Sequence, residues 1–85
     1  MGLFGPSKAE REEREKNKAK YLRFSETVQA RLRADLKKEQ NILRLLKLPV
    51  NGNDRHAIRG TESEIRAIEA ALRDEQQHYR ELRKS

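Results

Sequence analysis

The pair of residues in this chain that comes nearest to a chemical site is Glu75 and His78, three positions apart in Glu75-Gln76-Gln77-His78. On a helix this spacing puts a carboxylate and an imidazole on one face, as in helical bundles that bind two iron ions. Such a centre also needs carboxylates at the same level of a facing helix. In the pairing derived below, the nearest such acid, Glu39, falls roughly 15 Å away along the axis. We therefore expect no metal and no cofactor.

No other set of residues fits a catalytic site. The chain has no cysteine, no glycine-rich phosphate loop, and no nucleophile with a base near it in sequence. We expect no enzymatic activity and no small-molecule substrate.

The charge balance points instead to binding. The chain carries 20 Lys and Arg against 14 Asp and Glu, a net charge of +6, and the excess is concentrated in residues 21–48 and at the turn that follows. Such asymmetry favours an acidic or polyanionic partner, although a solvated basic face that keeps the protein in solution is an equally open interpretation. The candidate contacts to nucleic acid or an acidic partner are Arg31, Lys37, Lys38, Arg44, Lys47, Arg55 and Arg59.

Arg59 also begins a row of arginines that repeats every seven residues and continues with Arg66, Arg73 and Arg80. Regular cations suit phosphate contacts. The alternative is pairing within the helix, since Glu62 and Glu69 precede two of these arginines by four residues.

Two helices must carry these side chains. Ser7 and Glu10 form a capping box, and no Gly or Pro follows until Pro49, so we expect one helix over residues 7–48. Residues 49–53 contain Pro49 and Asn51-Gly52, which predict a turn. A second helix is expected over residues 54–84, capped by Asn53 or Asp54. It could instead start at Thr61, because Gly60 is unfavourable inside a helix.

Each expected helix carries an apolar stripe with a seven-residue repeat. Folding the chain back at Gly52 pairs residues whose numbers add to about 104, and the two stripes then meet in register. We call these facing positions the seam. Its rows are Leu22, Gln29, Leu36, Leu43 and Ser25, Leu32, Glu39, Leu46 on the first helix, and Ile58, Ile65, Leu72, Tyr79 and Thr61, Ile68, Glu75, Leu82 on the second.

The sequence thus predicts an all-α fold, an antiparallel two-helix hairpin with a long first helix and a shorter second. Residues 1–19 form a charged N-terminal arm, helical or disordered, and residues 20–85 form the hairpin. A seam this narrow buries too little to stabilise a lone hairpin, so we expect a homodimeric four-helix bundle or coiled coil. The expected core is Leu32, Leu36, Leu43, Leu46, Ile58, Ile65, Ile68 and Leu72.

The function expected from these features is that of a non-catalytic helical interaction and assembly module that self-associates and binds a protein partner. Leu3, Phe4, Leu45 and Leu48 are the expected docking residues, because one facing helix leaves them uncovered. Two alternatives stay open: non-sequence-specific binding of RNA or DNA, and a small inhibitor or adaptor of a larger complex. With neither a secretory signal nor a spanning segment, a cytoplasmic location away from membranes is expected.

Overall fold

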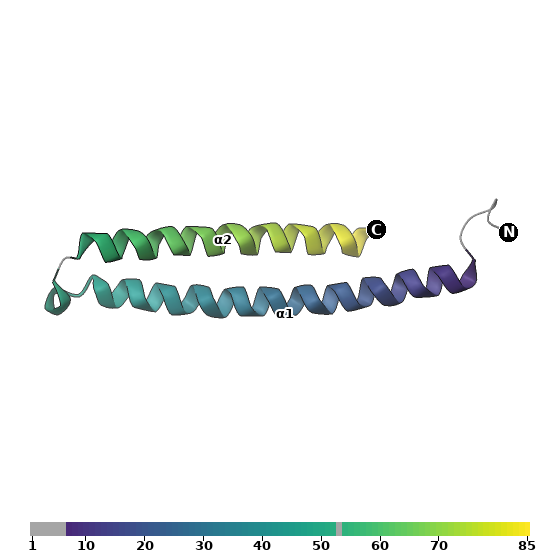
Figure 1. The fold of residues 1–85 in the computed structure, drawn as a ribbon, viewed down its shortest axis with the longest axis horizontal. Coiled ribbons are helices and arrows are strands. Elements are labelled where there is room, and N and C mark those ends of the chain that lie inside the picture. The colour runs from purple at the N-terminus through teal and green to yellow at the C-terminus, as the bar shows by residue number, and fades with distance from the viewer. Residues whose placement is uncertain (1–6, 53) are drawn as a thin grey trace.

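The computed structural model describes residues 7–52 and 54–85, and these residues form two long antiparallel helices joined by a short turn (Figure 1). Helix α1 spans Lys8–Leu46, the short 3-10 helix η2 spans Pro49–Asn51, and helix α2 spans Arg55–Lys84. The described residues contain no strand. The molecule measures 71 × 17 × 15 Å. The predicted all-α hairpin, with its long first helix and shorter second helix, is confirmed.

Helix α1 begins where the capping residue predicts. The Ser7 hydroxyl accepts a hydrogen bond from the backbone N–H of Glu10 at 3.2 Å, which satisfies one of the free donors of the first turn. Residues 8–17 are helical and exposed, and α1 continues past the end of α2 here (Figure 1).

The other end of α1 corrects the sequence prediction by two residues. The helix ends at Leu46 rather than Leu48, and Leu48 is extended, with φ −67° and ψ 137°. The cause is Pro49, whose ring disfavours a helical conformation in the preceding residue. The Asn51 side-chain amide then donates to the carbonyl oxygen of Leu45 at 2.7 Å, and Gly52 turns the chain with φ 71°.

Helix α2 begins at Arg55 and passes through Gly60 without interruption. The Asp54 carboxylate caps it, accepting from the backbone N–H of Ala57 at 3.1 Å. The alternative start at Thr61 is therefore wrong, and the other proposed cap, Asn53, lies outside the described residues. The seven-residue repeat, which extends from Ile58 to Tyr79, required this longer helix.

The seam forms as predicted, because every one of its positions is buried or half-buried. Three separate observations fix the register. Glu26 is hydrogen-bonded to Tyr79, Lys18 is hydrogen-bonded to Ser85, and Leu22 and Leu82 line one pocket. The numbers in each pair add to 104 within one unit. The core is nevertheless thin: among the described residues, Ile65 is the one apolar side chain that is buried, and the rest of the predicted core is half-buried.

The two described glycines with different backbone conformations test the helix assignment. We expect Gly60→Ala to raise the free energy of unfolding by about 1 kcal/mol, because alanine is the better helix former and nothing lies within 4 Å of its added Cβ. Gly52→Ala should lower it by about 1 kcal/mol, since Gly52 has a positive φ. Urea unfolding followed by circular dichroism measures both. A neutral or destabilising Gly60→Ala would contradict the continuous helix.

Candidate functional site

A polar layer interrupts the apolar seam. Ser25 is completely buried and Gln29 is 7% exposed. The Gln29 side-chain amide donates to the Ser25 hydroxyl at 3.2 Å, and the Arg33 guanidinium donates to the Gln29 carbonyl oxygen at 3.5 Å. No buried side-chain N or O atom among the described residues lacks a partner. A satisfied polar layer inside an apolar seam favours one register over its slipped alternatives.

Tyr79 links the helices beside this layer. Its hydroxyl donates to the Glu26 carboxylate at 2.7 Å, and the Arg83 guanidinium lies 5.9 Å from the centre of its ring. The hydrogen bond to Glu26 raises the pKa of Tyr79 above 10.0, because the bond needs the protonated phenol and the nearby negative charge opposes ionisation.

On the other side of the seam, Tyr21 packs against His78. The two rings meet edge to face, with their centres 5.4 Å apart. Because Tyr21–His78 and Glu26–Tyr79 lie on opposite sides of the seam, they define two broad surfaces that each run along both helices. Helical spacing then assigns the remaining outward residues to one surface or the other.

The first surface, which we call the apolar side, contains the Tyr21–His78 contact. On α1 it continues at alternating steps of three and four residues, and on α2 it consists mainly of small residues. Its α1 members are Tyr21, Phe24, Val28, Arg31, Asp35, Lys38, Ile42 and Leu45, and its α2 members are Ala57, Gly60, Glu64, Ala67, Ala71, Asp74, His78 and Glu81.

The second surface, the basic side, contains the Glu26–Tyr79 bond. Cations outnumber carboxylates there by more than three to one. The cations are Arg23, Arg33, Lys37, Arg44, Lys47, Arg59, Arg66, Arg73, Arg80 and Arg83, and the carboxylates are Glu26, Glu62 and Glu69.

The structure divides the predicted basic residues between these surfaces. Lys37, Arg44, Lys47 and Arg59 lie on the basic side. Arg31 and Lys38 lie on the apolar side, towards the outer edge of α1. Arg55 is the first residue of α2, next to the turn. The other arginines of the row begun by Arg59 join the basic side, and within the described residues none of the four forms the predicted ion pair with Glu62 or Glu69.

The predicted docking residues are exposed where the structure describes them. Leu45 is 52% exposed and Leu48 is 42% exposed, and both lie near the turn. Leu3 and Phe4 lie outside the described residues.

Three exposed apolar residues were missed by sequence reasoning: Val50 at 86%, Phe24 at 63% and Tyr21 at 37%. The signal that identifies Tyr21 and Phe24 is a second stripe, offset from the seam, which reappears at Ile42 and Leu45. It was overlooked because charged residues fill its middle.

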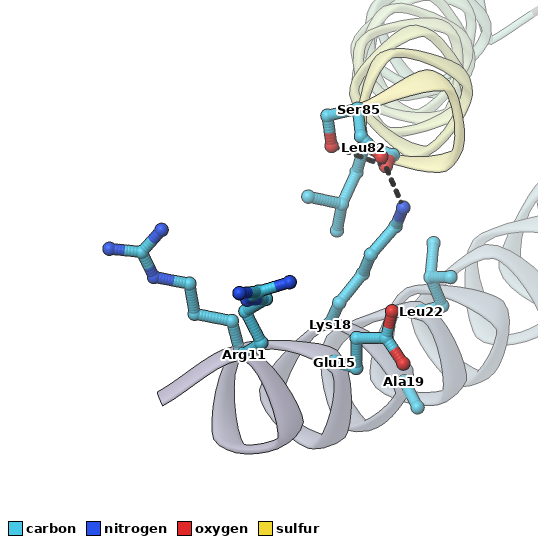
Figure 2. Close-up of a pocket in the computed structure, with 8 residues that line it drawn as sticks. Arg11, Glu15, Lys18, Ala19, Leu22, Leu82 and Ser85 are labelled. Carbon is cyan, nitrogen blue, oxygen red and sulfur yellow. Dashed lines mark hydrogen bonds between the residues drawn. The ribbon is translucent and has the colours of Figure 1, made fainter. Parts of the chain in front are cut away.

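An open groove lies where the end of α2 meets α1 (Figure 2). Leu22 and Leu82 converge within it, and Lys18 reaches across to donate a hydrogen bond to the backbone carbonyl oxygen of Ser85 at 2.6 Å. Arg11 and Glu15 line its outer part. The groove is wide and shallow, with charged walls that extend along α1.

The residues with metal-binding potential are spread apart. Glu75 is half-buried in the seam, whereas His78 packs on Tyr21 at the apolar side. Among the described residues, no three His, Cys, Asp or Glu side chains are grouped as a metal ion requires.

Neither long helix, over the part of the chain that the structure describes, has an apolar stretch sufficient to cross a bilayer. Comparison with protein-family models, curated proteins and solved structures gave no match to this chain. Function is therefore inferred from the two surfaces.

The Tyr79–Glu26 bond makes a testable prediction about alkaline pH. In a Tyr21→Phe background, where Tyr79 is the single tyrosine, absorbance should show the phenol ionising above pH 10, and Glu26→Gln should move its pKa down towards 10. A folded-state pKa above the unfolded one stabilises the protein below the unfolded pKa, and this stabilisation disappears as the pH rises through the folded value. The stability difference from Tyr79→Phe should therefore persist at neutral pH and vanish above pH 10. An unchanged pKa in Glu26→Gln would contradict the bond.

Proposed function

We propose that this chain is a non-catalytic helical assembly module that self-associates through its apolar side and offers the apolar residues of its turn to a protein partner. The observation that carries the proposal is the mismatch between the thin core and the exposed apolar residues. Ile65 is the one buried apolar side chain in the described region, whereas Phe24, Leu45 and Val50 are more than half exposed.

The mismatch has an energetic consequence. Burying a large apolar side chain fully contributes about 1.5–3 kcal/mol, and a half-buried one realises only part of this. Two facing helices cannot cover the seam further, because each seam residue already meets the opposite helix on one flank and water on the other. A second hairpin placed on the apolar side would cover the half-buried flank of the seam together with Phe24 and Leu45. This is the way in which antiparallel helix pairs complete a four-helix core.

The turn supplies the surface for a different protein. Leu48 and Val50 flank Pro49, and both are exposed at the end of the hairpin, with Leu45 one turn of helix away. The Asn51 bond to the Leu45 carbonyl oxygen holds this end of the chain in a fixed shape. A small, rigid, apolar tip is the kind of surface that inserts into a partner's pocket.

Sedimentation equilibrium tests self-association. We expect the wild-type chain to show twice the mass of one chain at high concentration, and Phe24→Glu or Leu45→Glu to shift it towards the single-chain mass without loss of helical circular dichroism. Ala34→Glu adds the same charge to an exposed position on the outer edge of α1 and should leave the mass unchanged. A wild-type protein that stays monomeric at every concentration would refute self-association.

A second candidate function, non-sequence-specific binding of RNA or DNA, is favoured by the basic side. Its cations run along both helices, and sequence-independent affinity for nucleic acid comes from such cations displacing the counterions of phosphates. The apolar side carries too few cations for this role, so the two functions use different surfaces.

A salt titration tests this second candidate. We expect measurable binding to duplex and single-stranded nucleic acid at low salt that weakens steeply as salt rises. The triple variant Lys37→Glu, Arg44→Glu, Arg59→Glu should lower the salt slope by about three, close to one unit for each phosphate that is no longer neutralised. The matched triple variant Lys8→Glu, Lys20→Glu, Lys84→Glu changes the net charge equally but lies off the basic side. Equal effects of the two triples, or no binding at low salt, would eliminate the candidate.

A further inference from the structure

The α1 part of the apolar side has the same pattern when it is read from either end. Large apolar residues occupy both ends, Tyr21 and Phe24 at one and Ile42 and Leu45 at the other. Charged residues occupy the centre. Because α1 is one unbroken helix from Lys8 to Leu46, all of these side chains project from a single straight surface.

This stripe is accessible to a partner. Phe24 is 63% exposed, Leu45 is 52% exposed and Tyr21 is 37% exposed, while Ile42 is half-buried at the margin of the seam. By helical spacing the stripe lies about 100° around α1 from the direction of α2. A helix docked on it would therefore stand beside α1 at the next corner of a square, and would leave α2 undisturbed.

We propose that the occupant of this stripe is α1 of a second copy of the chain, running antiparallel, with residues paired so that their numbers add to about 66. Tyr21 then meets Leu45 of the second copy, and Phe24 meets its Ile42. Each contact occurs twice, because the two-fold axis that relates the copies makes the interface self-complementary. The inference rests on the proposed self-association and specifies its geometry.

The central charges select this arrangement. In the antiparallel pairing Arg31 lies opposite Asp35 of the second copy, so two ion pairs of opposite sign flank the axis. In a parallel pairing Asp35 would lie opposite Asp35, and Arg31 opposite Arg31. Like charges placed against each other in an interface cost several kcal/mol. The charged centre thus fixes the direction of pairing, and the apolar ends supply the buried area.

The apolar ends select the register. Shifting the second copy by one seven-residue repeat would keep Asp35 opposite a cation, Lys38. It would also place Arg31 against Ile42 and move Phe24 beyond the end of the second copy's helix, towards Pro49. The pairing that adds to about 66 is therefore the one that satisfies the apolar ends and the charged centre together.

The α2 part of the apolar side is compatible with this symmetry. The two-fold axis passes α1 near Arg33, which the hairpin register places level with Ala71 of α2. Ala67 and Ala71 are exposed and small, so two copies of α2 can approach there without a clash. The four helices then form a square bundle in which both basic sides face outward.

Charge exchange tests the pairing in the full chain. Arg31→Asp alone and Asp35→Arg alone each place like charges across the axis, and we expect each to weaken the dimer at least tenfold by sedimentation equilibrium. The double variant Arg31→Asp, Asp35→Arg restores opposite charges and should recover the wild-type dissociation constant to within about threefold. Arg23→Asp, the same change on the basic side of α1, should have little effect. Circular dichroism verifies that every variant stays helical.

Spin labels test the direction independently, and the absence of cysteine makes single-cysteine variants selective. Lys20 and Ala34 lie two repeats apart on the same outer edge of α1, so in an antiparallel dimer the two labels at Ala34 lie close together. The two labels at Lys20 then lie about 40 Å apart, at 1.5 Å per residue from the axis. Equal short distances at both positions, or a double variant that fails to recover, would overturn the antiparallel pairing while leaving self-association intact. A monomeric wild-type chain would overturn both.

Discussion

The zipping of α1 against α2 along the seam is the contact on which every other feature of this molecule depends. Separate helices of this composition would be unstable, because each presents only a narrow apolar stripe and most of its surface is charged. Once the stripes meet, every outward residue acquires a definite side, and the chain gains two surfaces of opposite character. The polar layer formed by Ser25 and Gln29 contributes little burial of apolar area, but it penalises any slip of one helix past the other. The bond between Glu26 and Tyr79 joins the two helices in the same register.

The two surfaces give the hairpin a direction in function. One side combines large apolar residues on α1 with small residues on α2, which is the composition of a helix-packing surface. The other side carries a dense row of cations with few carboxylates, which opposes self-packing because like charges would be buried together. Association on the first side and polyanion contact on the second are therefore compatible, and a dimer would present two basic sides facing outward. The apolar tip around Leu48 and Val50 is separate from both and remains free for a different protein.

Much of this architecture follows from local rules that a sequence makes visible. Ser7 and Asp54 were identifiable as caps, Pro49 and Gly52 as the turn, and the repeat of Ile58, Ile65 and Leu72 as one face of a helix. The two errors are also local in origin: α1 stops two residues early because Pro49 forces Leu48 out of the helix, and α2 tolerates Gly60 because the seam continues on both sides of it. The exposed residues Tyr21, Phe24 and Val50 escaped notice, since a stripe interrupted by charges gives a weak periodic signal.

The sequence by itself determined the two helices, the place where the chain reverses and the register of the seam, because capping, helix breaking and seven-residue periodicity act over short distances along the chain. Only the tertiary structure decided which side of the hairpin each outward residue occupies. Arg31 and Lys38 could not be separated from Lys37 and Arg44 by composition, since all four project away from the seam. The position of the second helix sets that division: it gives each side chain a left and a right, and so separates an apolar side from a basic one.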